Sequence, residues 1–397
     1  MEAIKNRIRD LAAAFLPEIT AIRRHLHQHP ELSKEEFKTA GFICSMLDEY
    51  GISYKRNIAG TGILAMITGA GTGRCIALRA DMDALPVTEE NDVPYKSSEP
   101  GKMHACGHDA HMACLLGAAK ILNEIKQDFK GTIKLIFQPS EETYPGGAIG
   151  MIREGILHDP EVELVIAQHV INNLNAGTVG LKPGAYMAST DEIFLTVRGK
   201  GGHAATPEQV VDPILIASHI IVALQQIVSR NAVPTMPTVL SFGKIEGKGR
   251  TNIIPDVVTV EGTMRTYNED WRKKIQETIA KMASSIAEGM GGSCETRIAH
   301  GYPYLHNNEI LAGKLKVLAA EYLGQNNVLD LEARMTAEDF AYYCLEVPSC
   351  MYRLGIRNEE KNISSNLHTA TFDIDESSLG TGTGLMAFLA VSQLAEL

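Results

Sequence analysis

Short apolar runs that alternate with amphipathic segments constrain the fold of this chain more than any other feature. Beginning at residue 74, the runs CIALRA, TIKLIF and ELVIA are separated by segments such as LLGAAKILNEI, in which apolar residues recur with a helical period. Strands that alternate with amphipathic helices typically form a mainly parallel sheet with helices on both faces. The pattern therefore predicts an α/β domain.

A different pattern follows the segment LKPGAYMAS. Residues 191–199 alternate in polarity like a half-exposed strand, and we expect Pro207 to open a long helix with an apolar stripe. The further expected elements are a strand at 238–246, a strand at 256–267, a helix at 269–288 and a strand at 294–300. The resulting order, βαββαβ, predicts a compact α+β sandwich of one antiparallel sheet and two helices.

The alternation of the first domain resumes after His300, so the second domain is predicted to be inserted in the first. A chain of 397 residues is long enough to form two cores. We expect the first domain at 1–187 and 303–397 and the inserted domain at 188–302. Such an insertion would place its two linkers side by side as a hinge.

The N-terminal segment is expected to begin with a helix that Pro30 interrupts. Ser33, with Glu36 three positions later, matches a capping box, so we expect a second helix to begin at Ser33. In RRHLHQHPELS only His25 and His29 would share a helix face, and we interpret this segment as structural rather than metal-binding. Likewise, LGTGTGLMAFL lacks the strand unit of a dinucleotide site and is interpreted as a helix packed through its glycines.

Charge and composition argue against several classes of protein. The formal net charge is −11 and no basic face is visible, which argues against nucleic-acid binding. The start, MEAIKNRIRDLAAAF, lacks the apolar core and cleavage site of a signal peptide, and no stretch approaches the roughly 20 apolar residues of a membrane span. The seven cysteines are scattered, unlike a disulfide framework. We therefore expect a protein of the reducing cytoplasm that binds neither nucleic acid nor membranes.

Three predicted strands run into polar residues that are suited to chemistry. These residues are Asp81 and Asp83 after CIALRA, Glu141 and Glu142 after TIKLIFQPS, and His169 after ELVIAQ. Ligands of open α/β sheets bind at the carboxyl ends of the strands. These side chains can therefore converge although they are far apart in sequence.

The segment MHACGHDAHM contributes a further cluster, with Cys106 and His108 just before Asp109. Asp109 suits the N-cap of a helix that carries Leu115 and Leu122. The side chains of Cys106 and His108 would then project from the entrance of that helix.

Several chemistries use a cysteine beside histidines. A nucleophilic Cys106 with His108 as its base leaves the polar residues at the other strand ends without a role. A redox pair needs a Cys-x-x-Cys spacing, whereas the next cysteine is Cys114, and structural zinc needs four closed ligands, usually with more cysteines. A catalytic metal site combines thiolate, imidazole and carboxylate and leaves positions for water. The remaining alternative, a buried Cys106 beside a surface His108, does not account for the other strand ends.

Nine segments, distributed over almost the whole chain, resemble one family in the order in which that family has them. They are ALRADMDALP, MHACGHDAH, QPSEE with GGA close behind, AQHV, GKGGHAATP, RTNIIPD, GTMRT, AEDFAYY and NLHTATFD. The family comprises metal-dependent amidohydrolases that cleave N-acyl amino acids, including hippurate hydrolases, plant auxin-conjugate hydrolases and bacterial N-acetyl-diaminopimelate deacetylases, and is related to aminoacylase and zinc carboxypeptidases. The resemblance implies a zinc-exopeptidase-like catalytic domain and an inserted dimerisation or lid domain.

The resemblance also implies a centre with two divalent metal ions, for which zinc, manganese, cobalt and nickel are the candidates. Its protein ligands in this sequence would be Cys106, His108, Glu142, His169 and His368. With five protein ligands for two ions, one of the ligands must bind both ions in addition to the shared water. We take the Cys106 thiolate as the candidate for this bridging ligand. Two ions polarise the scissile carbonyl and lower the pKa of a shared water, and Glu141 would accept its proton as general base. Asp83 would orient a ligand imidazole, unless Asp81 and Asp83 only cap the turn before Pro86.

For the inserted domain, the resemblance implies roles for three residues. His203 in GKGGHAATP would reach across a dimer to the scissile carbonyl and donate a hydrogen bond to the developing oxyanion. Asn252 and Arg265 match positions near the substrate carboxylate or oxyanion, and a planar guanidinium donates two parallel hydrogen bonds to a carboxylate. The alternatives are that His203 is only a loop histidine and that Arg265 pairs with Glu261. Hinge closure would bring these groups to the metals only when substrate is held.

The predicted function is that of a metal-dependent amidohydrolase, which cleaves the amide bond of N-acyl amino acids or similar small conjugates through a metal-activated water. We expect a homodimer or higher homo-oligomer formed through the inserted domain. The alternatives are a dipeptidase or carboxypeptidase on the same scaffold and a non-catalytic protein that binds amino acids or peptides. The chain departs from its relatives at INNLNAGT, EETYPGGA and Ala370, so the acyl and amino-acid preference is left open.

Overall fold

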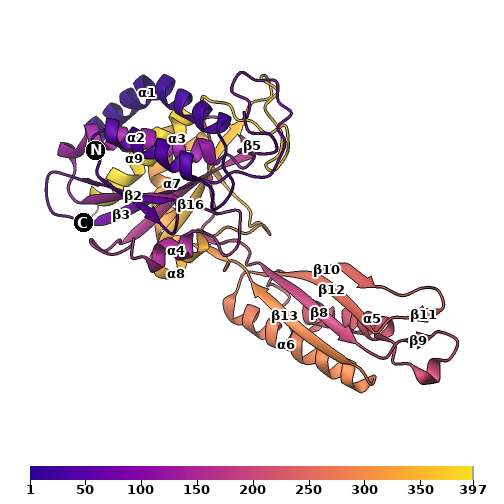
Figure 1. The fold of residues 1–397 in the computed structure, drawn as a ribbon. Helices are drawn as coiled ribbons and strands as arrows, with labels where there is room; N and C mark the ends of the chain where they lie inside the picture. The colour runs from indigo at the N-terminus through magenta and orange to yellow at the C-terminus, as the bar shows by residue number, and fades with distance from the viewer. Residues whose placement is uncertain (396–397) are drawn as a thin grey trace. The chain divides into compact units, whose positions relative to one another are not determined.

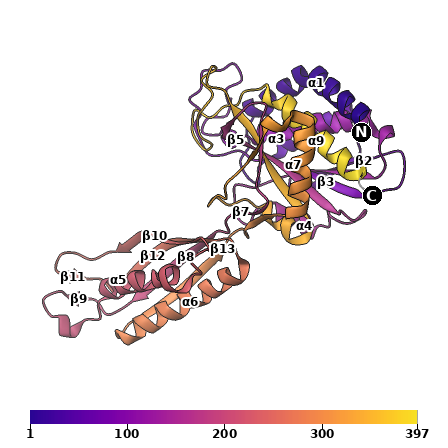
Figure 2. The ribbon, with the colours of Figure 1, turned by 180° about the vertical axis from the view of Figure 1, so that it is seen from behind.

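The computed structural model describes residues 1–395, which form two compact units (Figures 1 and 2). Unit 1 comprises Met1–Gly184, His306–Glu332 and the described residues from Asp339 onward. Unit 2 comprises Ala185–Leu305 and Ala333–Glu338. The return of Ala333–Glu338 to unit 2 is not anticipated by the sequence, because this short segment carries no periodic pattern of its own.

Unit 1 is built on an eight-stranded sheet with the strand order β1-β2-β4-β3-β5-β16-β6-β15. Its strands are β1 (Tyr54–Ile58), β2 (Gly62–Thr68), β3 (Cys75–Asp81), β4 (Thr132–Gln138), β5 (Leu164–Asn175), β6 (Val179–Leu181), β15 (Val328–Asp330) and β16 (Ser349–Arg357). Strands β4, β3, β5 and β16 run parallel to their neighbours in this series. Every residue of β3 is buried, which explains its continuous apolar sequence. The predicted mainly parallel sheet is confirmed.

Helices flank this sheet. They are α1 (Glu2–Gln28), α2 (Phe37–Glu49), α3 (His108–Glu124), α4 (Ala148–Arg153), α7 (Glu309–Leu323), α8 (Ala341–Glu346) and α9 (Ser378–Ala395). Figure 1 shows α1, α2, α3 and α9 on one side of the sheet and α4 and α8 on the other. Helices α3 and α9 approach closely at Gly382, where a Cβ atom would lie 2.7 Å from the sulfur of Cys114. The glycine-rich segment near the C-terminus is therefore a packed core helix, as the sequence predicted.

Three local predictions for unit 1 are wrong. Helix α2 begins at Phe37 and not at Ser33, because the side chains of Ser33 and Glu36 bond to residues outside the helix. Helix α3 begins at His108 after an N-cap at Gly107, because the carboxylate of Asp109 is held in a buried ion pair instead of capping the helix. Strand β5 continues past His169 and ends at Asn175, so His169 lies within the strand and not after it.

Unit 2 has the predicted βαββαβ order. Its main elements are β8 (Asp191–Arg198), α5 (Pro213–Leu224), β10 (Thr238–Gly247), β12 (Val257–Thr266), α6 (Glu269–Gly289) and β13 (Ser293–His300). The four strands form an antiparallel sheet in the order β10-β12-β8-β13. Residues such as Ile193, Val260, Ile216 and Ile279 form its core between the sheet and the two helices.

The long helix of unit 2 begins later than predicted. Pro207 opens only a 3-10 turn, Pro207–Gln209, and α5 begins at Pro213. The carboxylate of Asp212 caps α5 by accepting a hydrogen bond from the amide of Ile214 at 2.8 Å. An aspartate followed by proline is a strong start signal for a helix, and this signal determines where α5 begins.

Short strands accompany the main elements. Strands β9 (Gly202–His203) and β11 (Ile253–Ile254) form one pair, and β7 (Gly184–Met187) and β14 (Leu305–Asn307) form another. The second pair joins the two segments of chain that link the units. The two linkers therefore lie side by side, as the inserted topology predicted.

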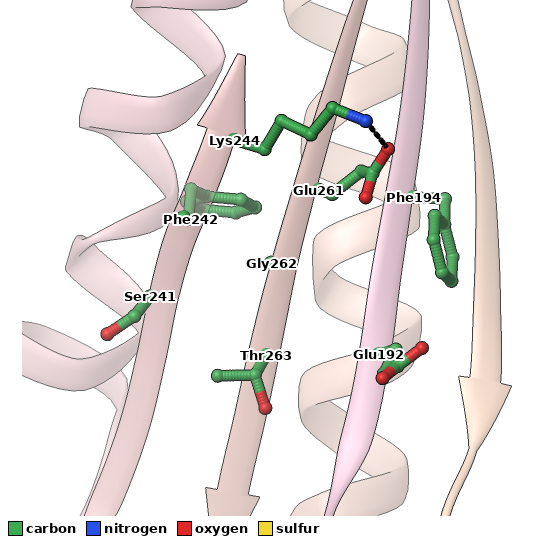
Figure 3. Close-up of a pocket in the computed structure, with 9 residues that line it drawn as sticks. Glu192, Phe194, Ser241, Phe242, Lys244, Glu261, Gly262 and Thr263 are labelled. Atoms are coloured by element: carbon green, nitrogen blue, oxygen red, sulfur yellow. Dashed lines mark hydrogen bonds and ion pairs between the residues drawn. The ribbon is translucent and has the colours of Figure 1, made fainter. Parts of the chain in front are cut away.

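The face of the unit 2 sheet that α5 and α6 leave uncovered is hollowed between β8, β10 and β12. Figure 3 shows this pocket of about 380 Å³, where Gly262 lies between the rings of Phe194 and Phe242. The ion pair of Lys244 with Glu261, at 2.7 Å, borders it. None of the side chains that the sequence singled out for catalysis lines this pocket.

By length and composition, two helices among the described residues could span a membrane, although no such segment was expected. In Ser378–Ala395, which is α9, 83% of the apolar window is buried within the chain, whereas the value for Pro213–Asn231 is 33%. The core helix of a folded domain meets the same criterion, and α9 is such a helix. Helix α5, within the second segment, contributes Ile216, Ile220 and Leu224 to the core of unit 2.

A buried ion-pair network connects α1 to two later segments of unit 1. The fully buried guanidinium of Arg23 donates to Asp109 at 2.7 Å and to Asp373 at 2.8 Å, and it lies over the ring of Tyr95. Burial alone would raise the pKa of Asp109, but the charges of Arg23 and His27 outweigh burial and hold that pKa well below its usual value. Arg23 therefore pairs with a fully buried carboxylate, that of Asp109, and with the partly buried Asp373.

Replacing Arg23 by methionine is expected to destabilise the protein strongly. The variant takes the guanidinium away from the fully buried carboxylate of Asp109, which also contacts His27, and from the partly buried Asp373; breaking a buried ion pair typically costs about 3–5 kcal/mol. The adjacent Arg24, whose side chain is 44% exposed and pairs with Glu376, provides the control. Arg24→Met is expected to cost roughly 1 kcal/mol or less. Urea unfolding of both variants measures the difference, and equal losses would contradict the assigned role of Arg23.

Candidate metal centre

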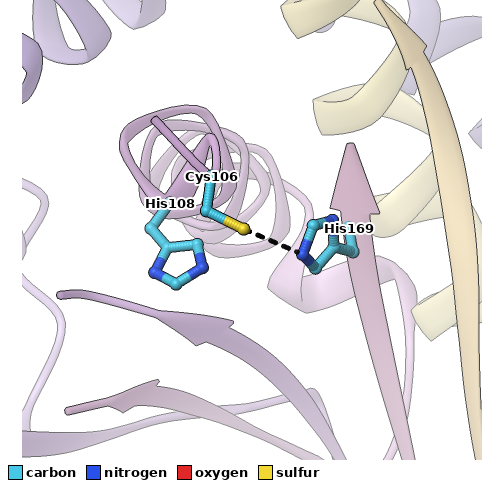
Figure 4. A group of neighbouring side chains, drawn as sticks. All are labelled: Cys106, His108 and His169. Carbon is cyan, nitrogen blue, oxygen red and sulfur yellow. Dashed lines mark hydrogen bonds between the residues drawn. The ribbon is translucent and has the colours of Figure 1, made fainter. Parts of the chain in front are cut away.

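Five side chains from separate parts of unit 1 converge near the carboxyl ends of β3 and β4. Cys106 and His108 come from the entrance of α3, Glu142 from the loop after β4, His169 from β5 and His368 from the loop before α9. Figure 4 shows the sulfur of Cys106 directed at the ring of His169, with His108 beside it. The sulfur lies 3.6 Å from His169 Nε2 and 3.3 Å from His368 Nε2. The structure thus brings together all five side chains that the sequence selected as metal ligands.

The ligand atoms form overlapping groups. The atoms of Cys106, His108 and His169 lie within 4.8 Å of one another, and so do those of Cys106, Glu142 and His368. A third group of this kind combines His108 and Glu142 with Glu141. Cys106 is therefore common to two groups, and Glu141 lies directly beside the ligands.

The backbone of this region is unusual at three positions. Gly107, between Cys106 and His108, has a φ of +84°, and a Cβ atom there would collide with the side chain of Val170. Two residues other than glycine also have positive φ: Ser140, at +57°, and His368, at +62°. Such conformations cost about 1–3 kcal/mol each and persist only where the surroundings enforce them. Their concentration here is typical of a functional site.

Hydrogen bonds fix the rings of the histidines. Nδ1 of His108 donates to the carbonyl oxygen of Asp83 at 2.8 Å, which leaves Nε2 free to face the centre. Nδ1 of His169 donates in the same way to the carbonyl oxygen of Val170. Both nitrogens of His111 are already engaged, by Asp81 at 2.6 Å and by the amide of Val170 at 2.8 Å. His111 therefore supports the site without being available as a ligand.

The carboxylate of Asp83 holds the backbone that carries the two glutamates. Its oxygens accept hydrogen bonds from the amides of Glu141 at 3.0 Å and Glu142 at 2.9 Å. One of these oxygens also lies 3.3 Å from Nδ1 of His108. Asp83 therefore lies against the imidazole of His108 and holds the backbone of Glu141 and Glu142, which is more than capping a turn.

Electrostatics set the protonation of the ligand atoms. Hydrogen bonding of its ring to Cys106 and to the carboxylate of Glu142 raises the pKa of His368 to about 10. Burial raises the pKa of the Cys106 thiol, and burial holds the pKa of His169 well below its usual value. At neutral pH, without a bound cation, His368 therefore carries a proton while His169 is a neutral imidazole.

The chemistry of these residues fits a pair of divalent cations. Among the described residues, Nε2 of His108 is buried without a hydrogen-bond partner, whereas Oε1 of Glu142, also buried, lies 3.4 Å from Nε2 of His368. Buried polar atoms of this kind are rare and costly unless a ligand satisfies them. Imidazole nitrogen, thiolate sulfur and carboxylate oxygen are the donors that zinc and similar ions use. A cation bound among these candidate ligand atoms would satisfy the buried atom that lacks a partner.

The three residues predicted to contact substrate lie in unit 2. His203 is exposed on β9, and its neighbour Ala204 donates an amide hydrogen bond at 3.1 Å to the carbonyl oxygen of Asn252. Arg265 lies on β12 and donates to the carbonyl oxygen of Met335 at 3.0 Å. The alternative pairing of Arg265 with Glu261 is wrong, because Glu261 binds Lys244 instead. The roles of His203, Asn252 and Arg265 in binding stay predictions.

Comparisons with known proteins agree with this picture. The model of the peptidase family M20/M25/M40 matches residues 77–392. N-acetyl-L-cysteine deacetylase of Bacillus subtilis (strain 168) is 41% identical over 362 residues, which are 91% of this chain and 85% of that protein. Thermostable carboxypeptidase 1 of Saccharolobus solfataricus is 36% identical over 395 residues, which are 98% of both.

A solved structure extends the similarity to three dimensions. The dinuclear metal-binding peptidase of the M20 family from Bacillus subtilis is 32% identical, with a TM-score of 0.82, over 97% of this chain and 100% of that one. With a matching α/β architecture and a cluster of metal-ligating side chains, the protein has the features of a metallohydrolase class. The chain belongs to the peptidase family M20/M25/M40. The family resemblance drawn from the sequence is confirmed.

Replacing Gly107 by alanine is expected to disrupt the metal centre. A Cβ atom at residue 107 would collide with the side chain of Val170 and displace the segment that carries Cys106 and His108. Gly101 is the control, because it also has a positive φ, +77°, but nothing lies within 4 Å of its position for a Cβ. Both variants bear the left-handed strain of about 1–2 kcal/mol.

Zinc titration against a chelator measures the outcome for these two variants. We expect Gly107→Ala to weaken zinc binding by at least about tenfold, which corresponds to 1.4 kcal/mol, and Gly101→Ala to leave it unchanged. Equal zinc affinity in both variants would contradict the placement of Cys106 and His108 around a metal.

Metal binding is expected to release protons and to tighten as pH rises. The pKa of His368 is raised to about 10, and the pKa values of Cys106 and His108 are also raised, so all three are protonated at neutral pH and must lose a proton to become ligands. Zinc affinity should therefore increase about tenfold per pH unit for each proton displaced between pH 6 and 8.5. The slope should fall by one proton in His368→Asn. An affinity that does not depend on pH would contradict this assignment.

Proposed function

We propose that this protein is a metal-dependent amidohydrolase that cleaves the amide bond of N-acyl amino acids or similar small conjugates. The observation that carries the proposal is the overlap of two groups of ligand atoms at one buried edge of the sheet, with the carboxylate of Glu141 beside them. The centre would hold two divalent ions through Cys106, His108, Glu142, His169 and His368. The similarity to a deacetylase of N-acetyl-L-cysteine supports this reaction class.

Cys106 is the proposed bridge between the two ions. Its sulfur belongs to both groups, one with His108 and His169 and the other with Glu142 and His368. A thiolate carries a full negative charge and can share it between two cations. His108 and Glu142 also belong to more than one such group, and Cys106 is proposed because it is the thiolate among them.

Bound ions of this kind polarise a carbonyl group and lower the pKa of water. Glu141 is the proposed general base: it accepts the proton of the attacking water and then delivers it to the leaving nitrogen. Its main chain is held by Asp83, so the carboxylate is presented in a fixed direction. His203 is the proposed hydrogen-bond donor to the oxyanion, and Asn252 and Arg265 are the proposed partners of the substrate carboxylate.

Two further features belong to the proposal. Dimerisation through unit 2 is supported by apolar residues exposed on α5, where Leu215 and Val222 are 50% and 72% exposed. A cytoplasmic location is supported by the seven cysteines, all of which are free thiols. The metal is one of zinc, manganese, cobalt and nickel, and supply in the cell as well as the ligands selects among them.

The carboxypeptidase or dipeptidase reaction is the second candidate. The observation that favours it is the 36% identity to a thermostable carboxypeptidase over almost the full length of both chains. The two reactions share the metal centre and the general base. They differ only in whether the group on the carbonyl side of the scissile amide is a plain acyl group or an aminoacyl group.

Replacing Glu141 by alanine is expected to abolish hydrolysis while metal is retained. Loss of a general base typically lowers kcat by about 10²–10⁴-fold. Metal content by elemental analysis should stay at two ions per chain in Glu141→Ala and should fall in the control Cys106→Ala. Unchanged turnover in Glu141→Ala, or tight ligand binding without turnover in the native protein, would contradict the proposal.

The assay should use acetyl, benzoyl and aminoacyl amides of the same set of amino acids. The proposed amidohydrolase hydrolyses the acetyl or benzoyl compounds with the higher kcat/KM. A preference for aminoacyl amides would replace it by the dipeptidase reaction on the same centre.

A further inference from the structure

A short segment between α1 and α2, Ser33–Glu36, lies against the loop that carries the two glutamates of the site. Glu36 is completely buried, yet both of its carboxylate oxygens are engaged. Oε1 accepts hydrogen bonds from the amide of Ser140 at 2.7 Å and from its hydroxyl at 3.0 Å. Oε2 accepts one from the hydroxyl of Thr61 at 2.8 Å. The side chain of Glu36 caps no helix amide, although Glu36 is the N-cap residue of α2.

Ser140 is the residue that these bonds hold in a strained conformation. Its φ of +57° lies in the left-handed region, which costs residues other than glycine roughly 1–2 kcal/mol. The hydroxyl of Ser140 also accepts a hydrogen bond from the amide of Lys34 at 2.9 Å. Both the backbone and the side chain of Ser140 are therefore bound by one segment, and the conformation persists because that segment enforces it.

A second contact from the same segment reaches the next two residues. The hydroxyl of Ser33 donates to Asp83 Oδ2 at 2.6 Å, and Asp83 accepts the amide hydrogens of Glu141 and Glu142. Three successive amides, those of residues 140, 141 and 142, are thus held by two buried carboxylates. Since a peptide bond is rigid, the dihedral angles at residue 140 set the direction of the chain that follows.

We propose that Glu36 is a positioning residue, which holds Ser140 in the left-handed conformation and thereby aims the carboxylates of Glu141 and Glu142 at the metal centre. This inference rests on the proposed function, in which Glu141 is the base and Glu142 a ligand. Without Glu36, Ser140 relaxes towards an ordinary negative φ, and both glutamates turn away from their places. Glu36 touches neither substrate nor metal.

The first test compares Glu36→Ala with Glu35→Ala. The neighbouring Glu35 is the matched control, because its side chain is 62% exposed and pairs only with Lys102, at 3.5 Å. Glu36→Ala should lower kcat by about 10–100-fold with a smaller change in KM, since losing the correct geometry of a catalytic group has effects of this size. It should also weaken zinc binding several-fold, and Glu35→Ala should change neither. Wild-type kcat and zinc affinity in Glu36→Ala would overturn the proposal.

The second test is a rescue that a merely structural role of Glu36 would not produce. Glycine adopts positive φ without strain, whereas alanine does not, and both lack the hydroxyl of serine. In the Glu36→Ala background, Ser140→Gly should therefore restore kcat and zinc affinity several-fold above the level reached with Ser140→Ala. Equal values in the two double variants would overturn the proposal.

A conservative variant guards against misfolding of Glu36→Ala. In Glu36→Gln the amide oxygen can still accept the hydrogen bond from Ser140, while the amide nitrogen donates to Thr61. Its kcat and zinc affinity should stay within about threefold of the wild type, as expected when the acceptor is kept. A Glu36→Gln variant that folds but is impaired as much as Glu36→Ala would overturn the proposal.

The zinc measurements separate this inference from the proposed function. A native protein that binds zinc but hydrolyses no amide would refute the amidohydrolase proposal alone. Zinc affinity that is equal in Glu36→Ala and Glu35→Ala would refute the positioning role alone.

Discussion

The gathering of charged and polar side chains at one buried edge of a parallel sheet is the constraint on which the rest of the structure depends. Strands β3, β4 and β5 run parallel, so the residues at and beyond their carboxyl ends meet although they are distant in sequence. At that edge Nε2 of His108 is buried without a hydrogen-bond partner among the described residues. A buried polar atom of this kind is costly unless a ligand satisfies it.

Buried carboxylates form the layer that supports this centre. Asp83 binds the amides of both glutamates, Asp81 binds His111, and Glu36 binds Ser140. These three carboxylates accept hydrogen bonds from backbone amides and from the ring of His111, and the bonds fix the orientation of those groups. None of the three carboxylates is needed as a metal ligand. The N-terminal part of the chain, through α1 and the segment after it, therefore contributes to the site without reaching it. Preorganised support of this kind is what keeps catalytic geometry within narrow limits.

The sequence predicts those features that depend on a local period or a recognisable motif. The alternation of strands and helices, the βαββαβ insertion and the ligand residues Cys106 and His108 belong to this class. Features that depend on a partner distant in the chain cannot be predicted from the sequence in this way. The pattern Ser-x-x-Glu at Ser33 matches a capping box, but Ser33 donates to Asp83 after β3 and Glu36 binds Ser140 after β4, and these partners replace the helix amides. Asp109 likewise leaves the N-cap role because the distant Arg23 binds it.

Anomalous diffraction from crystals of the protein with zinc tests the central claim most directly. The account predicts two peaks per chain, separated by roughly 3.5–4 Å as in other two-metal sites, with the sulfur of Cys106 between them. Glu142 and His368 should bind one ion, and His108 and His169 the other. A single peak, or peaks that lie outside these five side chains, would contradict the account.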